Sequence, residues 1–395
     1  MRLGGVAWRL GARRFGGRLR AVAMLLACVG LAGCETVGYY GQAVRGQLEI
    51  LAGRQRIDDL LQQASTPEPL RVRLRLVQAA REFASTALGL PVGERYTSYV
   101  DLGRPYAVWN VFATPELSLT PREWCYPIAG CAVYRGYFDR ADAEAFAATL
   151  RAEGEDVHVG GVVAYSTLGW FDDPVLSSFD SLREEDLVGL VFHETAHSLV
   201  YVPGDSRFNE GYATFVEEEG LRQWYATAGV RVGGEAASAA GVDTAAAVER
   251  VRHERAVRAA FLRFVLGHRD ALAALYAQQL PAAEMRARKA ALFAHMRVEY
   301  ASSTDIFAGR YDRFFGETLN NARLVTFSTY HDWVPAFAEL HHRAGSWPAF
   351  HAQVRALADD DAQARTAKLD ALLASARSRR AADDAAALAV QDSRR

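Results

Sequence analysis

Two histidines and a glutamate near the middle of the chain have the types and spacing of a catalytic metal site. His193, Glu194 and His197 form the pattern His-Glu-X-X-His within VFHETAH. Side chains four residues apart on a helix lie one above the other, so both imidazoles can bind one metal ion. The adjacent carboxylate can then accept a proton from a water on that ion. A random chain of this composition shows the pattern about once or twice in a hundred cases, so chance is a weak explanation.

The surrounding residues predict the helix that this pattern requires. Ser181 and Glu184 have the spacing of a capping box, and three acidic residues, 184–186, favour a helix N-terminus. Pro203-Gly204 is a stop signal. We therefore expect a helix over 182–201 with both histidines on one face.

A third ligand is expected on the next helix. NEGYATFVE (209–217) resembles the NEGFA-type helix of gluzincin aminopeptidases, in which the Glu after the Asn is the third zinc ligand. The resemblance implies that Glu210 completes the site and that Glu217 supports a ligand from outside. The connection from His197 is shorter than in the best-known gluzincins, which leaves Asp205 as an alternative ligand. We rank Glu210 first.

The same resemblance implies an oxyanion donor downstream of the metal helices. Tyr330 and His331 in TYHDW are the candidates, with Tyr330 as the catalytic residue, and the alternative is that Tyr330 is a core residue. Asn320 and Asn321 are candidate substrate-binding or structural donors.

Gly160 and Gly161 interrupt a predicted strand just before the active-site helix. Such a strand is expected to bind the substrate backbone at a sheet edge, and glycines permit a close approach. The strand lacks the Glu of the well-known aminopeptidase motif, so recognition of the substrate amino group stays unassigned.

Periodicity predicts an α+β protein in which a small mixed sheet precedes the active-site helix and a mainly helical half follows it. Strands are expected over 106–112, 132–138 and 155–167. Helices are expected over 39–51, 70–88, 140–153, 182–201, 209–226, 243–267, 281–299 and 331–357. Residues 358–395 hold few large apolar groups, which predicts a frayed helical or disordered tail.

The N-terminus resembles a bacterial lipoprotein signal. A basic segment precedes the short apolar run 21–30, which is too short to span a membrane, and Leu-Ala-Gly-Cys ends at Cys34. We predict that 1–33 is a signal peptide and that Cys34 is lipid-modified; the alternative is an ordinary signal peptide with a chance cysteine. An Asp directly after the cysteine would resemble an inner-membrane retention signal, but this chain has Glu35 at that position. We therefore favour the outer membrane, with the protein at its periplasmic face.

Two further cysteines, Cys125 and Cys131, lie in WCYPIAGC. In an oxidising periplasm they are expected to form a disulfide. A metal site on this pair is the alternative, but the sequence offers no further cysteine to complete it.

The charge distribution argues against nucleic-acid binding. Six of the 45 basic side chains lie within residues 1–33, where no acidic one occurs, so the remainder carries 39 basic against 47 acidic side chains. Such an acidic body binds phosphate backbones poorly. No Gly-rich phosphate-binding loop of standard spacing is present.

The wider pattern resembles the family of putative aminopeptidase lipoproteins of proteobacteria. The likeness rests on RPYAVWNVFATPE (104–116), WCYPIAGC, VGGVVAYSTLGWFDDPV (159–175), FHETAH and NEGYA, and covers most of 34–357. It implies a zincin-like peptidase domain over 34–357 that binds Zn2+ and acts on peptides. An endopeptidase for envelope proteins and a non-catalytic zinc-binding lipoprotein are the alternatives. The oligomeric state is not predicted.

Overall fold

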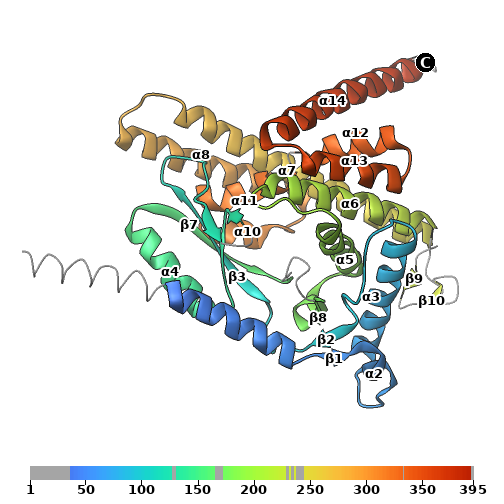
Figure 1. Ribbon diagram of the computed structural model, residues 1–395. Coiled ribbons are helices and arrows are strands. Elements are labelled where there is room, and N and C mark those ends of the chain that lie inside the picture. The colour runs from blue at the N-terminus through green and yellow to red at the C-terminus, as the bar shows by residue number, and fades with distance from the viewer. Residues whose placement is uncertain are drawn as a thin grey trace, which may run out of the picture. The chain divides into compact units, whose positions relative to one another are not determined.

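The computed structural model in Figure 1 describes residues 36–126, 130–164, 172–227, 231–232, 235–236, 244–331 and 333–392. The chain divides into two units, Met1–Ala52 and Gly53–Arg395. The described part of the first unit is a helix over residues 36–52, and the predicted signal segment with Cys34 lies outside the described residues. Among the described helices, none combines the length and apolar character that a membrane span requires.

Two three-stranded sheets lie in the N-terminal half of the second unit. One has the order β6-β3-β7, with β3 (Val108–Pro115) between β6 (Arg135–Tyr137) and β7 (Glu155–Val162), all antiparallel. β3 is rich in β-branched and aromatic residues and is buried along nearly its whole length. Helix α4 (Arg140–Ala152), capped by the Asp139 carboxylate, packs on this sheet.

The other sheet has the order β1-β2-β8. Its strands are β1 (Gln55–Arg56), β2 (Ser98–Val100) and β8 (Val175–Leu176), and β2 runs parallel to β8. Two hairpins complete the described strands: β4 (Trp124–Tyr126) with β5 (Gly130–Ala132), and β9 (Arg231–Val232) with β10 (Glu235–Ala236).

Helices make up most of the rest of this unit (Figure 1). They are α2 (Ile57–Gln62), α3 (Glu68–Thr86), the 3₁₀ turn η1 (Ser177–Ser181), α5 (Glu184–Leu199), α6 (Ser206–Thr227), α7 (Thr244–Tyr276), α8 (Ala282–Ser302), α9 (Thr304–Phe307), α10 (Asp312–Gly316), α11 (Asn321–His331), α12 (Val334–Ala344), α13 (Trp347–Asp359) and α14 (Ala362–Asp392). The helix predicted over 331–357 is interrupted because Gly345 ends α12 in a left-handed conformation, with φ 70°.

The predicted capping box before the active-site helix is wrong. Ser181 ends the 3₁₀ turn, where its hydroxyl donates to the Ser178 carbonyl at 3.2 Å. Helix α5 begins at Glu184 after an extended Arg183 that provides no side-chain cap. The Ser181 hydroxyl is therefore bonded within the 3₁₀ turn and does not cap α5.

Two apolar clusters hold the helices in place. Phe192 on α5 has no exposed surface and packs against Phe83 of α3 and Trp224 of α6, with ring centroids 5.7 and 6.3 Å away. A second cluster joins α7, α8, α10 and α11 around Phe261 and Met296. The first cluster fixes the two helices that carry the predicted metal ligands.

The C-terminal segment is helical, which is one of the two alternatives predicted for residues 358–395, and its first part is packed on the domain. Helix α14 lies along α12 (Figure 1), with Leu369 fully buried and Arg379 paired to the buried Glu339 at 2.9 Å. Few large apolar side chains are needed here because ion pairs and hydrogen bonds make much of the contact. Composition therefore underestimates the packing of this segment.

Candidate metal centre

The two histidines and Glu210 come together at the crossing of α5 and α6. The Nε2 atoms of His193 and His197 lie 3.3 and 3.7 Å from Oε2 of Glu210. One ligand atom from each of the three residues lies within 4.8 Å of the others. All three side chains are at least four-fifths buried. The arrangement therefore presents three metal-ligating atoms to a common point.

Burial and the charges of neighbouring side chains shift the pKa values of this cluster in opposite directions. Burial would lower the pKa of His193, but the carboxylates of Glu210 and Glu217 raise it well above its ordinary value. Burial would raise the pKa of Glu210, but His197 and His193 hold it well below its usual range. Burial raises the pKa of Glu194, with the two histidines opposing the shift. The cluster thus favours a cation between the imidazoles and Glu210, and a metal ion competes there with a proton.

The short connection between the helices is a tight turn clamped by the residue before the third ligand. Asn209 is 2% exposed, and its side-chain amide both donates to the Val202 carbonyl and accepts from the Val202 amide, each at 2.8 Å. Gly204 supplies the left-handed conformation, with φ 80°. These contacts bring α6 back beside α5 within a few residues and direct Glu210 toward the histidines.

Asp205, the alternative ligand, is engaged elsewhere. Its Oδ1 accepts from the Phe208 amide at 3.0 Å, which caps the first turn of α6. Its Oδ2 accepts from Nε of Arg365, on α14, at 2.8 Å. The geometry therefore favours Glu210 as the third ligand, as predicted.

Glu217 contacts Nδ1 of His193, while Glu210 lies near Nε2 of the same ring. Its Oε2 is 3.1 Å from Nδ1 of His193, and its Oε1 is 3.8 Å from Nη1 of Arg258. Gly189, one turn before His193, makes room for it, because a Cβ there would lie 3.1 Å from the Glu217 side chain. A carboxylate on Nδ1 fixes the ring orientation and leaves Nε2 available to a metal. Nδ1 of His197, in contrast, is buried without a partner among the described residues.

Tyr96 is a neighbour of the site that the sequence analysis missed. It is 3% exposed and has a left-handed backbone, with φ 59°, which is unfavourable for a bulky residue. Its amide donates to the Asp173 carbonyl at 2.8 Å. Burial, then the charges of Glu194 and Asp173, raise the pKa of Tyr96 well above its ordinary value, so the phenol keeps its proton. No local pattern marks this position, since the contact comes from the fold.

The asparagine pair, predicted as substrate-binding or structural donors, makes structural contacts. Asn320 donates from Nδ2 to a carbonyl of β7 at 2.9 Å. Asn321 has no exposed surface; its amide donates to the Glu116 and Ser118 carbonyls, and its Oδ1 accepts from the Tyr276 hydroxyl. Both side chains join α11 to the sheet region, which is the structural role of the two alternatives.

Gly160 and Gly161 lie on β7, which is an edge strand of its sheet. A Cβ at Gly161 would overlap the ring of Tyr106, so this glycine is required by packing. The placement at an edge is the one predicted, while contact with substrate stays a prediction. Tyr330 lies on α11, but its side chain is outside the described part of the chain, as is that of His331.

The predicted disulfide between Cys125 and Cys131 is present and joins β4 to β5. The same hairpin abuts the turn between the metal helices, because a Cβ at Gly130 would lie 2.8 Å from the Gly204 amide nitrogen. The loop thus helps to position α6, and the alternative metal site on the two cysteines is excluded.

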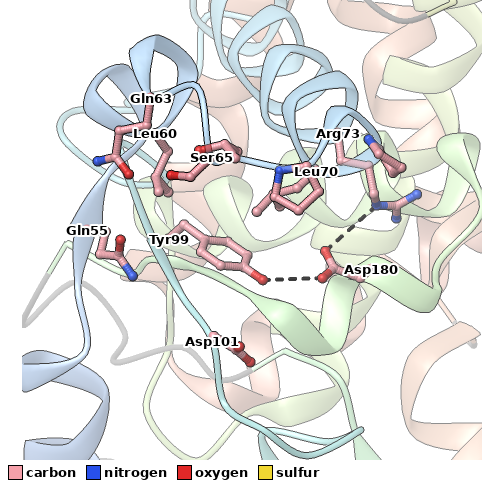
Figure 2. Close-up of a pocket in the computed structure, with 12 residues that line it drawn as sticks. Gln55, Leu60, Gln63, Ser65, Leu70, Arg73, Tyr99, Asp101 and Asp180 are labelled. Atoms are coloured by element: carbon pink, nitrogen blue, oxygen red, sulfur yellow. Dashed lines mark hydrogen bonds and ion pairs between the residues drawn. The ribbon is translucent and has the colours of Figure 1, made fainter.

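A cavity of about 560 Å³ lies beside α3 (Figure 2), and none of His193, His197 and Glu210 lines it. Figure 2 shows Tyr99 and Arg73 converging on Asp180; the Tyr99 hydroxyl donates to it at 3.2 Å, and Nε of Arg73 lies 3.9 Å away. Arg73 also donates to the Leu182 carbonyl at 2.8 Å. These contacts tie the segment before α5 to α3 and so fix where α5 begins.

A model of the family described as "Putative aminopeptidase" matches residues 38–369. The chain belongs to this family. The match includes α5 and α6 with the three side chains that could hold a metal ion, both strands β3 and β7, and the first residues of α14. No curated protein and no solved structure matches this member of the putative aminopeptidase family.

Proposed function

We propose that this protein is a zinc-dependent aminopeptidase with a zincin-like fold. The observation that carries the proposal is the convergence of His193, His197 and Glu210, with Glu194 next to the first ligand on the same helix. A purely structural zinc site does not need that second carboxylate. The family to which the chain belongs supports peptide hydrolysis.

One of the two separations around Glu210 matches the value expected for zinc, and the other is longer. Four bonds of about 2.0–2.1 Å at tetrahedral angles place neighbouring ligand atoms about 3.3–3.4 Å apart. The separations from Oε2 of Glu210 to Nε2 of His193 and His197 are 3.3 and 3.7 Å. Two neutral imidazoles and one carboxylate form a donor set that zinc uses in hydrolases, with one position open.

Zinc at this site would polarise the scissile carbonyl and make a water nucleophilic. In this proposal Glu194 accepts a proton from that water and returns it to the departing amine. His193 and His197 hold their ring orientation through packing on α5 and, for His193, through Glu217. Glu210 supplies negative charge that compensates the ion.

We assign Tyr96 a role as a donor to the carbonyl oxygen of the substrate. The residue is buried, burial and the charge of Glu194 raise its pKa so that it holds its proton, and it keeps a strained backbone conformation. A donor placed before the reaction begins stabilises the charge that develops on that oxygen. Tyr330, the donor implied by the family resemblance, stays a second candidate.

Asp173 is a further buried carboxylate near Glu194. It is 4% exposed and acts by charge on both Glu194 and Tyr96. The choice of an aminopeptidase rests on the description of the family to which the chain belongs.

A matched pair of peptides tests this function. One peptide has a free N-terminus and the other is N-acetylated, and mass spectrometry follows both with the zinc-loaded protein. We expect stepwise loss of single N-terminal residues from the free peptide alone. Internal cleavage of both peptides would replace the proposal by the endopeptidase alternative.

We also propose that the mature protein is anchored by lipid at Cys34 to the periplasmic face of the cell envelope, in the outer membrane. Leu31-Ala32-Gly33-Cys34 supports this proposal. Cys34→Ser is expected to release the protein from membranes or leave it unprocessed. Unchanged membrane fractionation and mass would contradict the anchor.

A further inference from the structure

A row of exposed apolar side chains follows one face of the helix over residues 36–52. The apolar row consists of Val37, Tyr40, Val44 and Leu48, whose exposed fractions are 72%, 40%, 59% and 59%. Successive members are three or four residues apart in the sequence, so they lie on the same face of the helix. Exposed apolar side chains normally occur singly on a protein surface, and a contiguous row of them indicates an interaction surface.

Exposed large apolar side chains are scarce elsewhere in the described part of the chain. Those of the second unit are Val298 on α8 and Ile306 on α9, and they lie on different helices. The helix over residues 36–52 thus carries most of them, although it is one short element. Val298 provides a solitary exposed valine with which the apolar row can be compared.

The charged side chains of this helix balance each other. Arg45 and Glu49 are the two charged residues within residues 36–52. They lie one helical turn apart and form an ion pair with a separation of 3.0 Å. The helix therefore has no net charge with which to attract a charged partner. Its apolar row suits an apolar partner, and burial of the row would provide the driving force.

The position of the helix in the chain indicates which apolar partner is nearest. The described part of the helix begins two residues after Cys34, at which we propose lipid modification. Two residues of extended chain span at most about 7 Å, so an acylated Cys34 would keep the first helical turn at the bilayer surface. The apolar row would meet the bilayer at a high effective concentration, whereas any soluble partner must diffuse to it.

From this combination we propose that the helix over residues 36–52 binds in the headgroup region of the membrane, with the apolar row inserted among the lipid acyl chains. This proposal rests on the lipid anchor at Cys34. An amphipathic helix at this depth binds through its buried apolar area, and a tyrosine such as Tyr40 can keep its hydroxyl in water there. The helix is then a second membrane contact directly beside the anchor, and two such contacts hold a protein more firmly than one.

Vesicle flotation of a chain without the lipid tests the helix separately from the anchor. The protein is the full mature chain with Cys34→Ser, and a series of lipid concentrations gives its partition coefficient. We expect it to float with vesicles of phosphatidylcholine. It should bind no more strongly to vesicles that also contain anionic phosphatidylglycerol, because apolar burial and not charge drives the binding.

Substitutions within the apolar row identify the side chains responsible. Val44→Ser and Leu48→Ser are each expected to lower the partition coefficient about tenfold, since each removes an apolar side chain from the membrane. Val298→Ser is the matched control: it makes the same change at a side chain that is 66% exposed on α8, and the partition coefficient should not change. Circular dichroism and thermal unfolding confirm that each variant is folded.

The same preparations separate this proposal from the proposed function. Peptide hydrolysis should be equal in all of them, so loss of vesicle binding and loss of the peptidase are distinguishable. The anchor is tested on its own by the membrane fractionation of Cys34→Ser in cells.

Four results would overturn the proposal. They are absence of flotation, binding only to the anionic vesicles, an equal loss in Val44→Ser and Val298→Ser, and a dimer in solution that dissociates in Val44→Ser. The last result, measured by sedimentation, would show that a second copy of the chain covers the apolar row in place of the membrane.

Discussion

The ion pair between Arg365 and Asp205 is predicted to stabilise the turn that precedes Glu210. Arg365 lies on α14, and its side chain is 5% exposed, while that of Asp205 is 18% exposed. Their charged atoms are 2.8 Å apart, and Arg365 also donates to the Asp360 carbonyl at 2.8 Å. Removing one partner of a buried pair leaves the other charge uncompensated, which costs about 3–5 kcal/mol.

Arg365→Met keeps most of the apolar stem and removes the charge. Because Asp205 retains its bond from the Phe208 amide and some solvent contact, we expect the lower end of that range, about 3 kcal/mol. Asp205→Asn preserves the helix cap and removes the other charge. The double variant should lose less than the sum of the single losses, with a coupling energy of about 2 kcal/mol.

Urea unfolding of the four proteins measures this cycle. Lys368→Met is the matched control, because Lys368 lies on the same helix in an exposed pair with Asp360, and its removal should cost less than about 1 kcal/mol. A loss below 1 kcal/mol in Arg365→Met, or additive single losses, would refute the conclusion that α14 is an integral part of the domain.

Three further predictions concern other described residues. Tyr96→Phe should lower kcat about a hundredfold with zinc content unchanged, and steady-state kinetics with metal analysis check this; an unchanged kcat would refute its role as a donor. Burial, then Arg323, lowers the pKa of His158 to about 4 from 6.5, so the unfolded chain takes up more protons between these values. Lowering the pH from 7 to 5 should therefore reduce the free energy of unfolding by about 2 kcal/mol through His158. Urea unfolding at both pH values should show a smaller reduction in His158→Gln than in the wild type. Gly161→Ala should destabilise the domain by about 1–3 kcal/mol because of overlap with Tyr106, and thermal unfolding of Gly161→Ala alone and with Tyr106→Ala should show partial rescue.

The residues that carry local signals could be predicted from the sequence. The spacing of His193 and His197 requires only a helix, and the acidic residues before it and the stop signal after it predicted that helix with boundaries wrong by two residues at each end. Glu210 was identified by its motif, and the turn clamped by Asn209 explains how a short connection still brings it to the histidines. The disulfide was predicted because an oxidising periplasm favours disulfides and because the sequence offers no further cysteine for a metal site on this pair.

Other features depend on contacts between distant segments. Tyr96 lies in a turn without any motif, and only the fold brings it to Glu194. Asn321 has the residue type of a substrate donor, but its partners are carbonyl groups some 200 residues away in the sequence. The packing of α14 depends on Arg365 and other polar contacts, which a prediction based on apolar composition does not detect.

The most direct test of the central claim measures metal content and hydrolysis in the same preparations. Wild type and Glu194→Gln should each hold about one zinc per chain, while His197→Ala and Glu210→Ala should lose it. Glu194→Gln should lose peptide hydrolysis by several orders of magnitude despite its metal. Full hydrolysis by Glu194→Gln, or a wild-type protein that binds no zinc, would contradict the assignment of a zinc peptidase.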